Sequence, residues 1–281
     1  MLPQDGHVHT EWSWDTVAGS MERSCARALE LGLPSVAFTE HADLTRWTIS
    51  PDFAPHLPER FAVLVTPHNT IEPPALDVAG YLDCVQHCRE LFPGLRIMSG
   101  VELSEPHWHT EAARALLRTP FDRVLGSVHS IRTGAGDLMV DAYYLDHPAD
   151  EVLRTYLAEV LDLVRSGADF AALAHVDYAV RAWPSAAGPF DPKRFEEEFR
   201  AVLGALADSG RALEINTRLP PHPEIVRWWH ALGGGAVCFG SDAHEPAAVA
   251  HGFADAAALA GACGFEPTDD PLACWTRHRV H

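Results

Sequence analysis

Short runs of apolar and β-branched residues alternate along the chain with longer stretches of helical periodicity. Seven runs have the length and composition of strands, and each is followed by polar or turn residues: 5–9, 35–39, 96–102, 123–128, 171–174, 213–215 and 236–239. Helical patterns follow them at 20–31, 75–92, 110–118, 149–166, 192–209, 223–232 and 246–263. Strands that alternate with helices are typical of βα units around a parallel sheet. The pattern therefore predicts an α/β fold.

The stretch 45–74 departs from this alternation. It contains six prolines, at Pro51, Pro55, Pro58, Pro67, Pro73 and Pro74. Such a density of prolines predicts a long irregular insertion after the second strand. Loops of this kind often cover a substrate site. Because the rest of the chain has no linker or repeat, we expect one domain over residues 1–281, interrupted only by this insertion.

Composition narrows the classes of partner. The chain of 281 residues carries 39 acidic and 21 basic side chains, which gives a formal charge of −18. A field of that sign disfavours binding along a nucleic-acid backbone, so we expect no long nucleic acid as a partner. The first ten residues lack the basic and apolar regions of a signal peptide, and no stretch has about 18 uninterrupted apolar residues. We therefore expect a cytoplasmic protein that does not contact a membrane.

Potential metal ligands stand where the predicted strands end, which is where barrel enzymes build their active sites. They are His7, His9, His41, Glu102, His129, His175, Asp242 and His244. Two residues apart on a strand, His7 and His9 point to the same side, and Asp242 and His244 repeat this spacing after the last strand. In a closed barrel the first and last strands are neighbours, so the two pairs converge. Asp15 follows in a loop, and its spacing alone is equally compatible with a turn or helix cap.

Six motifs then make the chain recognisable. They are DGHVHTEWSWD, FTEHAD, GVELSE, LGSVHS, LAHVD and GSDAHE. In this order they resemble the successive motifs of the PHP (polymerase and histidinol phosphatase) family, and the resemblance covers nearly the whole chain. It implies a distorted (β/α)7 TIM-like barrel with a trinuclear metal centre at the carboxyl ends of the strands.

The resemblance also implies a division of ligands among three divalent ions. The first ion would be held by His7, His9, Glu102 and Asp242, the second by Glu102, His129 and His175, and the third by Asp15, His41 and His244. Asp15 gains its support from this resemblance. Mixed imidazole and carboxylate ligands suit Zn, Fe, Mn or Co without choosing among them.

Charge indicates the reaction that such a centre would favour. Three divalent ions bring about +6 against three carboxylates, which leaves roughly +3 to attract a phosphate dianion and a hydroxide. We therefore expect hydrolysis of a small phosphomonoester, with a metal-bridging hydroxide as the nucleophile and no protein nucleophile. The resemblance makes histidinol phosphate the leading candidate substrate.

Basic residues near strand ends are candidates for holding the substrate. Arg132, Arg181 and Arg218 each follow a predicted strand, and guanidinium groups bind phosphate through two parallel hydrogen bonds. Arg181 and Arg218 resemble phosphate-binding positions of histidinol-phosphate phosphatases, and His222 is a candidate contact to the phosphate or the leaving group. A second HxH pair, His107 and His109, is compatible either with a substrate contact or with a solvated loop.

Two other functions remain compatible with the sequence. One is a phosphodiesterase or exonuclease-like hydrolase that acts on short nucleotides at the same metal centre. The other is a non-enzymatic, metal-binding regulatory subunit. Hydrolysis of a phosphomonoester would indicate the phosphatase, and hydrolysis of a dinucleotide would indicate the phosphodiesterase. Turnover of neither would indicate the binding subunit.

Overall fold

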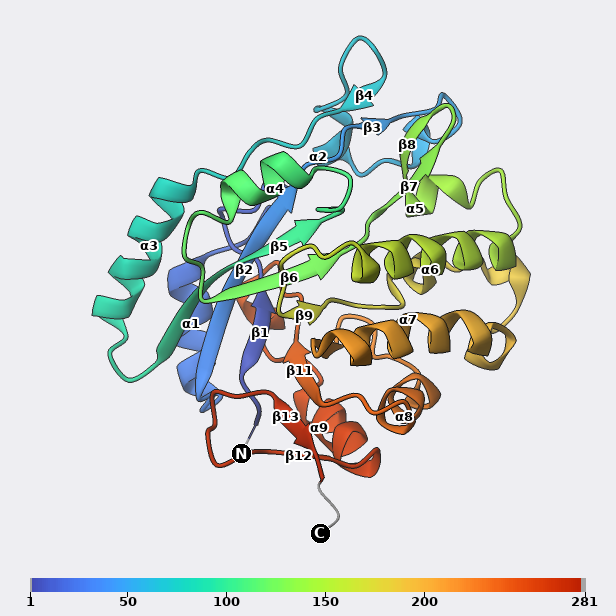
Figure 1. Cartoon of the computed structure of the whole chain (residues 1–281). Helices are drawn as coiled ribbons and strands as arrows, with labels where there is room; N and C mark the ends of the chain where they lie inside the picture. Colours follow the sequence, from blue (N-terminus) through green and yellow to red (C-terminus); the bar gives the residue numbers. More distant parts are fainter. Residues whose placement is uncertain (1, 279–281) are drawn as a thin grey trace.

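The computed structural model describes residues 2–278 and contains a strongly curled sheet of parallel strands (Figure 1). In spatial order its parallel strands are β1 (Asp5–Val8), β2 (Ser35–Asp43), β5 (Arg96–Ser104), β6 (Arg123–Ser127), β9 (Ala172–Leu173), β10 (Ala212–Asn216) and β11 (Ala236–Gly240). The sheet continues beyond β11 with antiparallel β13 (Trp275–Arg277) and β12 (Phe265–Glu266). All seven strands expected from the sequence are present.

The curled sheet closes on itself where β1 and β11 end. Val8 forms a parallel bridge with Ala243. The backbone N–H of His9 donates to the carbonyl oxygen of Ala243, and that of Asp242 donates to the carbonyl oxygen of His7, both at 2.8 Å. These bonds join the first and last parallel strands of the barrel. The predicted α/β, TIM-like (β/α)7 architecture is confirmed, and its closure brings the two ligand pairs together.

Helices cover the outside of the sheet (Figure 1). They are α1 (Met21–Glu30), α3 (Val78–Leu91), α4 (Thr110–Leu116), α6 (Ala149–Arg165), α7 (Glu196–Ser209), α8 (Pro223–Ala231) and α9 (Phe253–Ala262). In α6 the residues at spacings of three and four are buried against the core: Leu153, Tyr156, Leu157, Val160 and Val164. Burying each of these side chains contributes about 1.5–3 kcal/mol, so α6 is held against the core by this face.

Two of the predicted helices differ from the observed ones. The stretch 192–209 opens as a 3-10 turn, η4 (Pro192–Phe195), where the Asp191 side chain accepts a hydrogen bond from the backbone N–H of Lys193. The stretch 246–263 is broken after η5 (Pro246–Ala248), because Ala250 and Gly252 adopt positive φ angles of 53° and 70°. Left-handed residues cannot continue a right-handed helix, so α9 begins only at Phe253.

The stretch 45–74 is more ordered than the sequence suggested. It contains β3 (Trp47–Thr48), η1 (Ala54–His56), α2 (Glu59–Ala62) and β4 (Thr70–Ile71). These strands join the hairpin β7 (Ser130–Thr133) and β8 (Gly136–Met139) in a second sheet with the order β4-β3-β8-β7. A small core of its own holds the segment, formed by Trp47, Ile49, Phe53, Leu57, Ile71, Met139 and Ala142. The arrows of β2 and β5 point toward this sheet in Figure 1, so it stands over the end of the barrel where the site lies.

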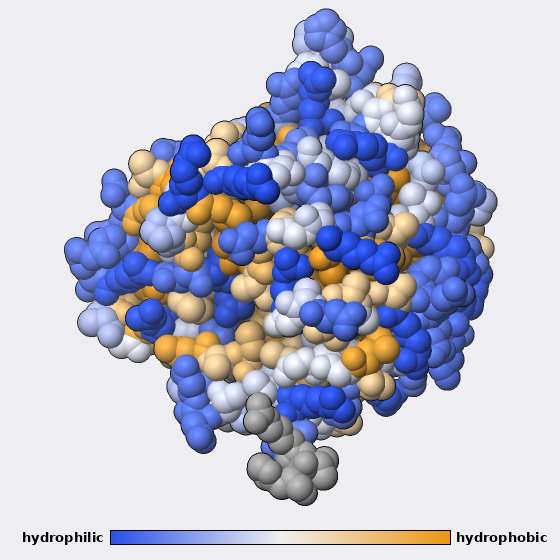
Figure 2. All heavy atoms as spheres, in the orientation of Figure 1, coloured by the Kyte–Doolittle hydropathy of each residue, from blue (hydrophilic) through white to orange (hydrophobic). Residues whose placement is uncertain are grey.

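Exposed large hydrophobic side chains are scattered along the described residues 2–278. On the face seen in Figure 2, hydrophilic residues predominate, with hydrophobic ones showing between them. The large hydrophobic side chains that are exposed lie far apart in the sequence: Val17, Leu29, Val63, Leu91 and Leu145. Within residues 2–278, no helix has both the length and the apolar character needed to cross a membrane.

Candidate metal centre

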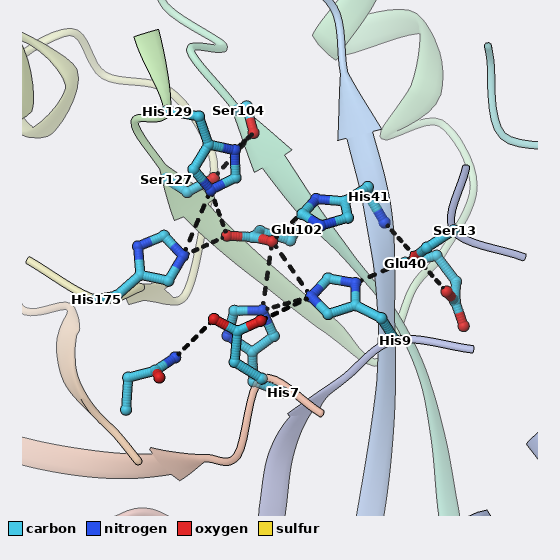
Figure 3. A network of polar contacts seen from close by, with 12 residues as sticks. His7, His9, Ser13, Glu40, His41, Glu102, Ser104, Ser127, His129 and His175 are labelled. Carbon is cyan, nitrogen blue, oxygen red and sulfur yellow. Dashed lines mark hydrogen bonds and ion pairs between the residues drawn. The ribbon is translucent and has the colours of Figure 1, made fainter. Parts of the chain in front are cut away.

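The side chains expected to bind metal converge at the carboxyl ends of the barrel strands, and Figure 3 labels His7, His9, His41, Glu102, His129 and His175 among them. They come from β1 and the loop after it (His7, His9, Asp15), from β2 and β5 (His41, Glu102), and from just beyond β6, β9 and β11 (His129, His175, Asp242, His244). Only Asp15 and His244 are partly exposed; the other seven are buried. The structure therefore brings all nine residues to one place.

Glu102 lies at the centre of this group. Its two carboxylate oxygens have a ring nitrogen of five different imidazoles within 3.4 Å, those of His7, His9, His41, His129 and His175. The shortest of these distances is 2.7 Å, from Oε1 to Nε2 of His175. Burial would raise the pKa of Glu102, but the neighbouring imidazoles hold it well below its usual value. Glu102 is therefore an ionised carboxylate among several potential ligands.

Asp15 lies beside a second part of the group. Its Oδ2 is 2.9 Å from Nε2 of His244 and 3.5 Å from Nε2 of His41. The His9 and His41 rings are stacked with centroids 4.1 Å apart. The sequence left the position of Asp15 open, and the fold places its carboxylate between two imidazoles.

The backbone is strained at two of the nine residues. His175 and Asp242 have φ angles of 20° and 53°, which side chains with a Cβ seldom adopt. Each such conformation costs of order 1–3 kcal/mol and persists only where the surroundings enforce it. For Asp242 the enforcing contact is the hydrogen bond from its N–H to the carbonyl oxygen of His7, which belongs to the closure of the barrel.

Three of the histidines are oriented from behind by hydrogen bonds. Nδ1 of His7 donates to Glu214 Oε1 at 2.7 Å, Nδ1 of His9 to Ser13 Oγ at 3.1 Å, and Nδ1 of His129 to Ser104 Oγ at 2.9 Å. The Ser13 hydroxyl donates its own hydrogen bond to Glu40, and the Ser104 hydroxyl donates to Asp43, so each can only accept from the histidine. With the proton on Nδ1, the lone pair on Nε2 faces the centre. This arrangement of outer partners is typical of metal-ligating histidines.

Sequence reasoning missed these outer carboxylates. Asp43 lies two residues after His41 on β2, so the alternation of strand side chains could have indicated it. Glu214 lies inside β10, in a strand to which no ligand was assigned. It reaches His7 because residue 240 is glycine: a Cβ there would collide with the Glu214 carboxylate and lie 2.5 Å from Cβ of His7.

Several triplets of these residues have the spacing required for a metal ion. Their ligand atoms lie within 4.8 Å of one another in His7–His9–Asp242, His7–Glu102–His175, His9–His41–His244 and His41–Asp43–His129. Oε2 of Glu102 and Oδ1 of Asp15 are buried yet have no hydrogen-bond partner among the described residues. A buried carboxylate oxygen without a donor is costly unless a cation compensates it. The site therefore fits divalent cations.

Two of the predicted phosphate ligands lie beside the site. Nη2 of Arg181 donates to Oδ2 of Asp242 at 2.6 Å and to Oδ1 of Asn216 at 3.1 Å. Arg218 is half exposed, and its Nη1 lies 3.4 Å from Oδ1 of Asp242. Both arginines line a cavity of about 470 Å³ above the histidine cluster. Four aromatic side chains also line it: Trp14, Trp47, Phe61 and Tyr178.

The other predicted substrate contacts do not line this cavity. Arg132 pairs with Asp137 at 2.9 Å, and its guanidinium lies over the Trp108 ring. His222 is exposed and caps α8, where its Nδ1 accepts a hydrogen bond from the backbone N–H of Glu224.

The second HxH pair also lies away from the cavity. His109 bonds to the Thr45 hydroxyl at 3.0 Å, and the His107 side chain, 8% exposed, lies 3.8 Å from Glu159. Neither ring therefore has access to a ligand in the cavity from these positions.

Comparison with known proteins agrees with the motifs. The model of the PHP domain matches residues 5–218. The chain is 31% identical to the probable histidinol-phosphatase of Deinococcus radiodurans over 264 residues, which cover 90% of each chain. It is 28% identical to the histidinol-phosphatase of Lactococcus lactis over 87% of this chain and 85% of that one.

Solved structures share the fold. The histidinol phosphate phosphatase of Lactococcus lactis, determined in complex with zinc, L-histidinol and phosphate, aligns with a TM-score of 0.77 at 23% identity and covers 97% of this chain and 98% of that one. A histidinol phosphatase structure from Listeria monocytogenes, described as putative, aligns with a TM-score of 0.71 at 19% identity, over 90% and 99% of the two chains. The motifs, the fold and the matched relatives agree, and the chain belongs to the PHP domain family.

Proposed function

We propose that this protein is a metal-dependent phosphomonoesterase and that its substrate is histidinol phosphate. The observation that carries the proposal is the position of Glu102 among five imidazoles, beneath a cavity that Arg181 and Arg218 line. The substrate is suggested by the names of relatives that match this chain over most of its length. Three divalent ions, held by the three ligand sets given above, are part of the proposal.

The donor set supports metal occupancy on electrostatic grounds. Nε2 of His7 and Nε2 of His9 lie 2.9 Å apart with their outer nitrogens both bonded elsewhere. Two facing lone pairs repel each other unless a proton or a cation lies between them. Imidazole and carboxylate donors suit zinc, iron, manganese or cobalt.

Metal loading is expected to release protons. Burial would lower the pKa of His41, but the carboxylates of Asp15, Asp43 and Glu102 raise it to about 9. The pKa of His129 is also raised well above its usual value: burial opposes the shift, and Glu102 and Asp43 cause it. A ligating imidazole must be neutral, so metal affinity should rise from pH 7 to pH 9, by up to about tenfold per pH unit for each proton released.

Calorimetric titration of the metal-free protein with zinc at pH 7 measures this release. The apparent binding enthalpy should differ between two buffers of different ionisation enthalpy, in proportion to the protons taken up by the buffer. The same enthalpy in both buffers would contradict the proposed ligation by His41 and His129.

Bound divalent ions would lower the pKa of water toward neutrality and neutralise charge on the phosphoryl group. The protein's own groups have three tasks. Arg181 and Arg218 contact Asp242 and line the cavity, where their guanidinium groups can bind phosphoryl oxygens. Glu214 holds the His7 ring in its orientation through a hydrogen bond to Nδ1. The aromatic side chains of the cavity receive the alcohol portion and exclude water from it.

A substrate panel tests the proposed function. With zinc, manganese, iron or cobalt added to metal-free protein, kcat/KM for histidinol phosphate should exceed that for p-nitrophenyl phosphate by at least about a hundredfold, because binding energy from the alcohol portion is used in the transition state. Preferential cleavage of a dinucleotide phosphodiester would support the phosphodiesterase alternative instead. Absence of turnover with every metal would support the binding-subunit alternative.

A further inference from the structure

One side of the cavity is formed by the segment where β8 passes into α5 (Val140–Tyr143). Met139, Val140 and Asp141 all line the cavity there. Ala182 and Leu219 add further apolar surface. Asp141 is thus a carboxylate that follows two apolar lining residues, Met139 and Val140.

Asp141 differs from the other acidic residues that line this cavity. Asp15, Glu102 and Asp242 belong to the proposed metal ligands, and Asp43 accepts hydrogen bonds from Ser104 Oγ and Trp14 Nε1. Asp141 accepts one hydrogen bond, from the backbone N–H of Ala142 at 3.0 Å. No ion pair joins it to a basic side chain in residues 2–278. Its side chain is exposed to the cavity, so its charge is available to a ligand.

The cavity is therefore lined by charged groups of two kinds. The metal ligands, Arg181 and Arg218 suit a phosphate dianion at the bottom of the cavity, whereas Asp141 would repel a dianion and attract a cation. Between the β2 end and the 45–74 segment, Trp14 lies 5.8 Å from Trp47 and 5.0 Å from Phe61, measured between ring centroids. These rings offer apolar surface to a flat group. A molecule with a phosphate, an ammonium group and an aromatic ring matches all three features.

We propose that Asp141 is a specificity-determining residue that forms an ion pair with the ammonium group of an amino-alcohol phosphate. The inference rests on the proposed function, since it concerns the alcohol portion of the same substrate. It adds a reason for discrimination: a phosphate ester without the ammonium group leaves the carboxylate of Asp141 unpaired inside the occupied cavity. An unpaired charge in a closed complex is costly, so the enzyme should discriminate against such esters.

The test compares L-histidinol phosphate with 3-(imidazol-4-yl)propyl phosphate, which lacks only the amino group. Asp141→Asn keeps the size of the side chain and removes its charge. It should lower kcat/KM for L-histidinol phosphate by about tenfold to a hundredfold and raise kcat/KM for the desamino ester, because the unpaired carboxylate charge is removed. Asp141→Glu, which keeps the charge, should retain part of the preference. Asp146→Asn is the matched control on an exposed position after α5.

Metal content and thermal unfolding of each variant are measured as well, so that a folding defect is recognised. If Asp141→Asn does not fold, kcat/KM of Asp141→Glu for the two esters is compared with that of wild type instead. The proposal is overturned if Asp141→Asn keeps the wild-type preference for the amino ester, or if it lowers kcat/KM for both esters equally. If the wild-type protein cleaves neither ester with any metal, the proposed function fails as well. Cleavage of both esters by wild type at equal kcat/KM would overturn the role of Asp141 alone.

Discussion

Replacing Glu102 with glutamine is expected to prevent full metal loading and to lower phosphatase activity by at least about a thousandfold, since the bound metals supply several kcal/mol of transition-state stabilisation. Glutamine has the same length and shape as glutamate but no charge. The five imidazoles around Glu102 would then surround a neutral amide. An amide also offers one oxygen donor where the carboxylate offers two, so it provides fewer ligand atoms for cations. Both effects weaken cation binding at the centre of the site.

Glu90→Gln provides the matched control for this change. Glu90 lies on the exposed face of α3, where its carboxylate accepts a hydrogen bond from Gln86. Metal analysis of the purified proteins and steady-state phosphate release should separate the two variants, with Glu90→Gln close to wild type. Wild-type metal content together with wild-type kcat/KM in Glu102→Gln would refute the assignment of Glu102 as the shared ligand.

The barrel could be predicted from the sequence because its strands are buried on both faces and therefore form continuous apolar runs. The ends of these runs were harder to predict. β2 and β5 extend to Asp43 and Ser104, beyond the expected ends at residues 39 and 102. Their last residues are polar, which in a sequence is typical of a loop. Here they are buried because they face the histidine cluster. The functional site itself therefore obscured the strand ends, and Asp43 was missed for this reason.

Contacts between distant segments explain the remaining differences. Two-residue strands such as β3 and β4 give no periodic signal, and β3 is defined by pairing with β8 almost ninety residues away in the chain. The three candidate arginines also could not be distinguished from the sequence, because each follows a predicted strand. Asp137 lies five residues after Arg132 and pairs with it across a hairpin, whereas Arg181 reaches Asp242 only through the closure of the barrel. Position in the sequence could not distinguish them.

The difference between these two arginines leads to the second large effect. Arg181→Gln is expected to lower kcat/KM for histidinol phosphate by about a hundredfold while leaving most of the metal bound, because a charged hydrogen bond in a closed site contributes about 1.5–3 kcal/mol. The Arg181 guanidinium is largely enclosed and lies 5.0 Å from the centroid of the Tyr178 ring. Burial would lower its pKa, but Asp242 and Tyr178 raise it, so its positive charge persists at every pH used for assay.

Arg132→Gln makes the same chemical change at a position outside the cavity and should keep kcat/KM within about twofold of wild type, as is usual for an exposed ion pair. Because Arg181 also contacts Asp242, metal analysis must accompany the kinetics. A rate loss that zinc excess restores would mean that Arg181 acts by stabilising the metal ligand. We expect the loss of kcat/KM to persist at full metal occupancy. That result would indicate that the Arg181 guanidinium binds the phosphoryl group. Equal losses in Arg132→Gln and Arg181→Gln would instead mean that neither arginine acts through the position that the barrel gives it.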